Sequence, residues 1–110
     1  MKEKSLLLQL TGEMPAFKII DFLIENKGLD FTKKDIIEGA DISKATLFNY
    51  WAEVEKAGIV SPTRKFGKTV LFKLNSKNPV VKKILELETE LIRRSLDGAK
   101  PRKEILVEAR

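Results

Sequence analysis

Residues 32–58 decide the fold, and they read TKKDIIEGADISKATLFNYWAEVEKAG. Two helices separated by a tight turn are expected here. Thr32 suits the N-cap of the first helix, with the acid Asp35 three residues later as in a capping box. Ser43 suits the N-cap of the second helix, which extends to about Lys56. The stretch therefore predicts a helix-turn-helix.

Apolar side chains recur at helical spacing in the second of these helices. Leu47, Tyr50, Trp51 and Val54 fall at i, i+3, i+4 and i+7. This spacing gives the helix one buried face. Trp51 is accordingly assigned to the core and not to stacking on bases. The opposite side of the helix is then expected to face outwards.

The flanking segments extend the pattern on both sides. A helix is expected from Pro15 to about Asn26, with proline in its first turn. Two β-like runs, 59–65 and 69–74, follow the helix-turn-helix and are joined by a turn that contains glycine. A last helix follows Pro79 and extends to about residue 96. The order predicts a mainly α fold with a small β-hairpin (α+β): a winged helix-turn-helix with a three-helix core, a β-wing and a long C-terminal helix.

The composition excludes several classes of function. The chain has 110 residues, enough for one domain, and contains no cysteine and no histidine. Disulfides, metal sites built on thiolate or imidazole, and histidine-dependent catalysis are therefore excluded. No convergent catalytic set stands out, and no apolar run reaches membrane-spanning length. We expect a cytoplasmic protein that is not an enzyme, without metal, cofactor or membrane partner and with no small-molecule effector evident.

Positive charge is concentrated in one segment. The net charge is +5, yet residues 59–83 hold seven cations and no acid. These cations are Arg64, Lys65, Lys68, Lys73, Lys77, Lys82 and Lys83. A charge run is often only a solvated surface, and we interpret Lys82 and Lys83 in that way. For the remaining cations, the absence of acids and the position directly after the helix-turn-helix favour a nucleic-acid partner.

The exposed face of the helix that starts at Ser43 is expected to enter the major groove of DNA. Asn49 has the groups to pair with adenine, and Ala45 and Phe48 to touch thymine methyls. Packing against the wing is an equal alternative for Phe48. Lys44 is expected to reach guanine or a phosphate.

Further contacts are expected with the DNA backbone. Ser43 and Thr46 lie where a hydroxyl and helix N-terminal amides meet a phosphate. In the wing, Arg64, Lys65 and Lys68 are expected to contact phosphates or to enter the minor groove. Lys33 and Lys34, at the start of the preceding helix, are further candidates for phosphate contacts.

Two regions predict a dimer. The last helix shows Val80, Ile84, Leu87 and Leu91 at alternating four- and three-residue steps, like a short coiled-coil seam. The expected interface consists of Leu6, Leu7, Leu8, Leu10, Val80, Ile84, Leu87 and Leu91. The alternative is that the two regions cover each other within one chain. The expected organisation is an apolar segment at 1–14, a DNA-binding domain at 15–78, a dimerisation helix at 79–98 and a charged tail at 99–110.

Several stretches are similar to those of a known group. They are Leu6–Gly12, Ile19–Asn26, Phe31–Lys33, Ile42–Leu47 with Trp51, Lys56–Val60, Leu71–Asn75 and Asn78–Val81. Over residues 6–96 the chain resembles archaeal winged helix-turn-helix transcriptional regulators, which are broadly related to MarR- and ArsR-type repressors. The resemblance implies binding of double-stranded DNA, as a homodimer, through the helix that starts at Ser43 and through the wing. The group more often has Tyr-Arg at Phe48-Asn49 and Gly at Asp41, so this chain lacks an arginine that would contact guanine or phosphate.

Three functions fit these features. The favoured one is a sequence-specific transcriptional regulator, with repression as its expected action. The alternatives are a winged-helix protein-interaction module, since the fold alone does not guarantee DNA binding, and an architectural protein that binds DNA without sequence preference. The basic wing and the polar helix face favour the regulator.

Overall fold

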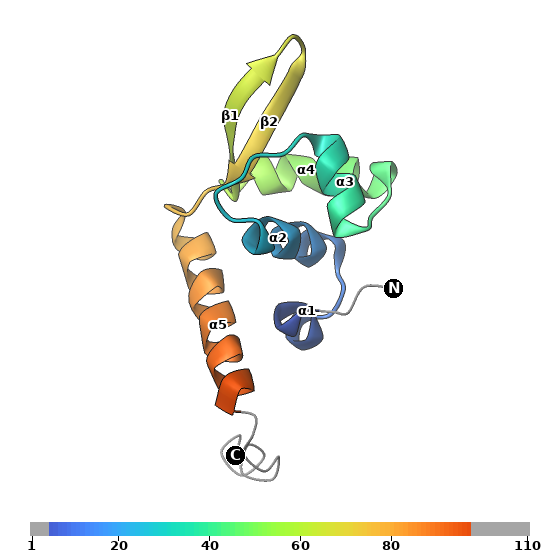
Figure 1. The fold of residues 1–110 in the computed structure, drawn as a ribbon. Coiled ribbons are helices and arrows are strands. Elements are labelled where there is room, and N and C mark those ends of the chain that lie inside the picture. The colour runs from blue at the N-terminus through green and yellow to red at the C-terminus, as the bar shows by residue number, and fades with distance from the viewer. Residues whose placement is uncertain (1–4, 98–110) are drawn as a thin grey trace.

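The computed structural model describes residues 5–97 of the chain. Its elements are α1 (Leu6–Thr11), α2 (Pro15–Glu25), α3 (Lys33–Ala40), α4 (Lys44–Lys56), β1 (Val60–Phe66), β2 (Thr69–Leu74) and α5 (Pro79–Leu96). The antiparallel hairpin of β1 and β2 projects from one end of the helical body, and α5 leads away towards the other (Figure 1). The predicted fold class, mainly α with a small β-hairpin and a long C-terminal helix, is confirmed. The tail expected at 99–110 lies outside the described residues.

Hydrogen bonds at the helix starts reproduce the predicted caps. The Thr32 hydroxyl accepts a bond from the Asp35 N–H at 3.0 Å, and the Asp35 carboxylate accepts one from the Thr32 N–H at 3.0 Å. This pair forms a complete capping box. The Ser43 Oγ accepts a bond from the Thr46 N–H at 3.0 Å at the start of α4. Local sequence therefore sets both helix starts.

The turn between α3 and α4 depends on Asp41. Its backbone is left-handed, with φ 57° and ψ 53°, a conformation that side chains other than glycine seldom adopt. Lys18 of α2 donates from its Nζ to the Asp41 carbonyl at 2.9 Å. The ammonium thus satisfies a carbonyl at the end of α3 and ties the turn to α2.

The helices and the base of the wing share one core. Its most deeply buried side chains are Leu7, Ile19, Leu23, Ile36, Leu47 and Val81. Trp51 is also buried, and its ring meets Phe72 of β2 edge-on with centroids 4.9 Å apart. The assignment of Trp51 to the core is confirmed. Tyr50, predicted to share that buried face, is only half-buried.

The N-terminal segment forms a short helix, although its sequence predicted only an apolar stretch. The Ser5 Oγ caps α1 by accepting a bond from the Leu8 N–H at 3.1 Å, and it donates to Asp21 of α2 at 2.6 Å. Leu7 is 0% exposed and Leu8 is also buried, since α1 packs against α2 and α5. For these two leucines the prediction of a dimer contact is corrected, because side chains covered by their own chain leave little surface for a partner.

The last helix covers the core with only one of its sides. Val81 is fully buried, and Ile84 and Leu91 are partly buried against the core. Val80 is 55% exposed, and Leu87 is exposed as well. The apolar stripe of α5 is therefore divided between the core and solvent.

Glu88 on α5 gives the first testable prediction. Burial raises its pKa, and repulsion from Asp21 and Glu25 raises it further, while Lys27 opposes the shift. Folding thus favours the protonated form, so the contribution of Glu88 to stability falls as the pH rises above the ordinary glutamate value of 4.5. We expect Glu88→Gln to raise the free energy of unfolding at pH 7, measured by urea denaturation. In this variant the free energy of unfolding should also fall less steeply as the pH rises. Glu86→Gln on the exposed side is the control, and a less stable Glu88→Gln protein would contradict the prediction.

Candidate nucleic-acid interface

The outward side of α4 carries the residues predicted to contact bases. Lys44, Ala45, Phe48 and Asn49 are all exposed, and Phe48 is 51% exposed. The buried side of the same helix holds it against the core. The exposed amide and ring therefore stand on a helix face that has the width to enter a major groove.

The first turn of α4 carries two paired hydroxyls. The Ser43 Oγ donates to the Thr46 Oγ1 at 2.8 Å while it accepts from the Thr46 N–H. The Ser43 proton is thus committed inside the cap. The Thr46 hydroxyl keeps its own proton, so Thr46 is the better of the two as a donor to a phosphate.

Lys33 connects α3, α4 and the wing. Its Nζ lies 5.4 Å from the ring centroid of Phe48, 5.5 Å from that of Trp51 and 6.0 Å from that of Phe72. These are cation–π distances. Lys33 is half-buried, whereas Lys34 is exposed. The predicted phosphate ligand Lys33 therefore lies over an aromatic cluster and places positive charge beside Phe48.

A hollow of about 410 Å³ between α3 and the wing brings three lysines together. It is lined by Thr32, Lys33, Lys34, Lys68, Thr69, Val70 and Phe72. Ammonium and hydroxyl donors of this kind suit phosphate oxygens. Because Lys33 also contacts the Phe48 ring, the hollow and the exposed side of α4 form one continuous surface.

The three predicted wing cations are not equivalent. Lys65 and Lys68 are exposed, but the Arg64 guanidinium is held by Asp30, with Nε–Oδ2 at 2.8 Å and Nη2–Oδ1 at 3.1 Å. The hydrogen bonds from Arg64 lower the pKa of Asp30, and Asp30 raises the pKa of Arg64. No local pattern marks Asp30, because its partner lies 34 residues further along the chain. Of the three predicted wing cations, Lys65 and Lys68 are therefore the better candidates for phosphate contacts.

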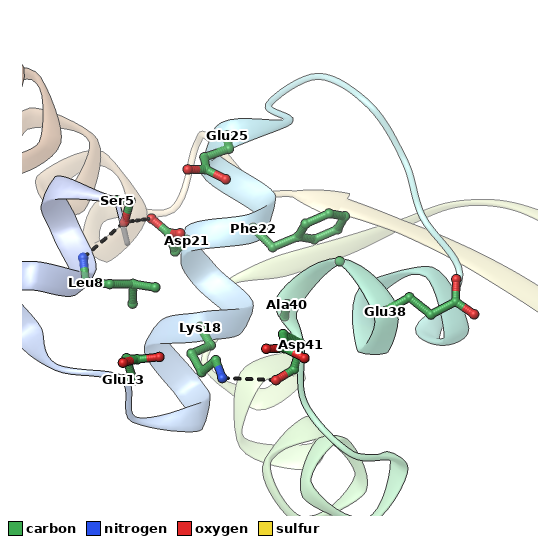
Figure 2. A pocket seen from close by; sticks show the side chains of 11 residues that line it. Ser5, Leu8, Glu13, Lys18, Asp21, Phe22, Glu25, Glu38, Ala40 and Asp41 are labelled. Carbon is green, nitrogen blue, oxygen red and sulfur yellow. Dashed lines mark hydrogen bonds between the residues drawn. The ribbon is translucent and has the colours of Figure 1, made fainter. Parts of the chain in front are cut away.

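A second hollow, of about 250 Å³, lies among α1, α2 and the end of α3 (Figure 2). Carboxylates dominate its charged lining, which comprises Glu13, Asp21, Glu25, Glu38 and Asp41 together with Lys18. Figure 2 shows the Lys18 side chain reaching the Asp41 carbonyl and Ser5 pointing to Asp21. Negative charge of this density repels a phosphate backbone. No sequence pattern marks the hollow, since three separate segments form it.

Residues 5–97 contain neither a metal-binding cluster nor a membrane-spanning helix of the following kinds. No group of three or more histidine, cysteine, aspartate or glutamate side chains is placed there to hold a metal ion. None of the helices in that range combines the length and the apolar character needed to cross a membrane.

Comparison with known proteins shows the fold. No protein-family model and no curated protein matches the chain. Among solved structures, NadR in complex with 4-hydroxyphenylacetate matches with a TM-score of 0.59 and 21% identity, over 94% of this chain and 74% of that chain. The AntR antimony-specific transcriptional repressor matches with a TM-score of 0.57 and 15% identity, over 83% of this chain and 78% of that chain. Sso10a-2, a DNA-binding protein from Sulfolobus solfataricus, matches with a TM-score of 0.53 and 20% identity, over 87% of this chain and 96% of that chain.

Identities at this level show a shared fold and nothing finer. The matches extend over most of the chain and include the helical body and the hairpin. The chain therefore has the winged helix-turn-helix fold, in which α3 and α4 form the helix-turn-helix and the hairpin of β1 and β2 is the wing.

Proposed function

We propose that the protein is a DNA-binding transcriptional regulator and acts as a repressor. The observation that carries the proposal is the continuous surface on which the lysine-lined hollow meets the exposed side of α4 through Lys33. In such a fold the helix supplies base contacts and the basic wing holds the backbone. AntR is described as a transcriptional repressor, which supports repression, and Sso10a-2 as a DNA-binding protein, which supports DNA binding. The resemblance to archaeal regulators favours the same class.

Within this proposal α4 reads the sequence. Asn49 pairs with adenine, and Phe48 and Ala45 contact thymine methyls. Lys44 reaches guanine or a nearby phosphate, and Thr46 donates to the backbone. The exposure of this side of α4 supports these roles.

We further propose that two copies form a homodimer through α5. Val80 and Leu87 expose apolar surface on this helix, and Leu10 at the end of α1 is exposed as well. Leu6, Ile84 and Leu91, which are partly buried, border that surface. A twofold dimer reads a palindrome whose half-sites lie about 34–36 Å apart or at a multiple of that distance.

Selection of bound sequences from a random DNA pool, at a fixed salt concentration, tests these proposals together. We expect a palindromic site. Asn49→Ala is expected to weaken binding to this site about tenfold to hundredfold, and to relax the preference at one position of each half-site. Equal weakening at every position would contradict the assignment of Asn49.

The same selection separates the alternative functions. Binding without any enriched sequence would favour the architectural protein, with a steep dependence on salt. No binding to any DNA would favour the protein-interaction module.

A further inference from the structure

We propose that Asp30 is a positioning residue for DNA binding, although it places a negative charge beside the basic surface. Its carboxylate clasps the base of the wing and sets where the wing stands relative to α4. The inference rests on the proposed function, because the wing must meet the DNA backbone while α4 lies in the groove.

The connection between α2 and α3 holds both strands of the wing, and Asp30 supplies its contact with β1. The Asp30 side chain is only 15% exposed. The Thr63 Oγ1 donates to it at 2.5 Å, and Arg64 donates through Nε at 2.8 Å and Nη2 at 3.1 Å. The next residue, Phe31, exchanges two backbone hydrogen bonds with Phe72 of β2, at 2.7 and 2.8 Å. The connection therefore binds β1 through side chains and β2 through the backbone.

A break in the strand register makes this contact with β1 possible. Pro62 pairs with Phe72 and Arg64 with Leu71, which leaves Thr63 as an extra residue in β1. Neighbouring residues of a regular strand point to opposite faces. A bulge re-aims side chains, and here Thr63 and Arg64 reach the same carboxylate. The bulge at Thr63 therefore makes it possible for the Asp30 carboxylate to accept hydrogen bonds from two successive residues of β1.

The contact extends along β1 towards the wing tip. Arg64 and Phe66 are two residues apart and share a face of the strand. The Arg64 guanidinium lies 5.4 Å from the centroid of the Phe66 ring, and Phe66 is 61% exposed. By holding Arg64, Asp30 also fixes the support of this exposed ring. An isolated two-stranded hairpin has little stability of its own, so the wing needs such an anchor.

Asp30 influences DNA binding through two effects of opposite sign. Its charge repels phosphates and neutralises Arg64, so this effect alone makes its removal strengthen binding. Its hydrogen bonds restrict the wing before DNA arrives, so their loss adds an ordering cost to binding. An Arg64 that is released from Asp30 gains at most one phosphate contact. A wing that is less ordered loses the fixed position of Lys65, Lys68 and Phe66 together. We therefore expect the ordering effect to dominate.

Asp30→Asn tests which effect dominates, because it removes the charge and nearly preserves the shape. We expect its affinity for the selected DNA to fall about threefold to tenfold at constant salt, by fluorescence anisotropy. Glu38→Gln, which removes an exposed acid of α3, is the matched control and is expected to leave affinity unchanged or higher. Thr63→Val removes one bond of the clasp without a charge change and is expected to weaken binding in the same direction. Tighter binding by Asp30→Asn overturns the proposal.

A measurement without DNA keeps this inference separate from the proposed function. We expect ¹⁵N relaxation of full-length Asp30→Asn to show lower order parameters over residues 61–71 than in the wild type, with α4 unchanged. If the wild type binds no DNA, the proposed function fails, and this result still decides whether Asp30 orders the wing. Unchanged order parameters over these residues would overturn the proposal that Asp30 orders the wing.

Discussion

The double variant Lys65→Ala/Lys68→Ala is expected to bind the selected DNA about tenfold to hundredfold more weakly than the wild type at the same salt. Both lysines are exposed, and Lys68 lines the hollow that α3 and the wing form. Each lysine that neutralises a phosphate releases condensed counterions, so the slope of log affinity against log salt should become shallower by about two. Anisotropy titrations at four salt concentrations measure affinity and slope together.

A second double variant controls for overall charge. Lys82→Ala/Lys83→Ala removes the same two charges from the exposed side of α5. We expect its salt slope to stay close to that of the wild type, because neither lysine lines the hollow between α3 and the wing and α5 leads away from the hairpin (Figure 1). Equal losses in the two double variants would show that binding follows net charge and not the wing surface. Lys33 is unsuitable for this comparison, since its removal also disturbs the aromatic cluster.

The largest effect on stability is expected from Gly39→Ala. A Cβ at this position would lie 2.0 Å from Cε1, 2.5 Å from Cδ1 and 2.6 Å from Cζ of Phe22. The Phe22 ring is itself packed against Phe31, with centroids 4.8 Å apart. Alanine favours a helix over glycine by about 1 kcal/mol, but overpacking commonly costs about 1–3 kcal/mol and shifts the backbone. We expect a net loss of unfolding free energy, measured by urea denaturation with Trp51 fluorescence.

A double-mutant cycle isolates the cause of that loss. Phe22→Leu should destabilise the wild type, since it removes a ring from the packing between α2 and α3. In the Gly39→Ala background the same change should cost less or should restore stability, because it makes room for the new methyl group. Additive losses, or a Gly39→Ala protein as stable as the wild type, would contradict the close approach of the two helices.

Local chemistry made much of the fold predictable. The capping box of Thr32 and Asp35 and the cap of Ser43 involve residues within three positions of each other, so sequence spacing suffices to identify them. Helix α1 escaped prediction because six residues form a stable helix only through tertiary packing. Its support comes from α2 and α5 and from the bond between Ser5 and Asp21. The packing role of Gly39 depends on a distant residue, because it lies inside α3 where a Cβ would meet the ring of Phe22 in α2.

The candidate site was predictable where helical periodicity separates inside from outside. That pattern placed Phe48 and Asn49 on the exposed side of α4. Lys33 over the aromatic cluster and Asp30 against Arg64 were not predictable, since both depend on how the hairpin folds back on a distant connection. Pairings of this kind are set by tertiary geometry.

The acidic hollow among α1, α2 and α3 has a consequence for the encounter with DNA. Its lining comes from α1, α2 and the C-terminal end of α3, whereas the lysine-lined hollow lies between the N-terminal end of α3 and the wing, so charges of opposite sign are separated in the molecule. Such a separation gives the protein an electric dipole moment, on which the field of a duplex exerts a torque. For the DNA binding proposed above, we therefore expect the protein to rotate wing-first during its approach, which makes a larger fraction of collisions productive. Raising the ionic strength shortens the reach of this torque, so the association rate should fall before the bound complex itself is weakened to the same degree.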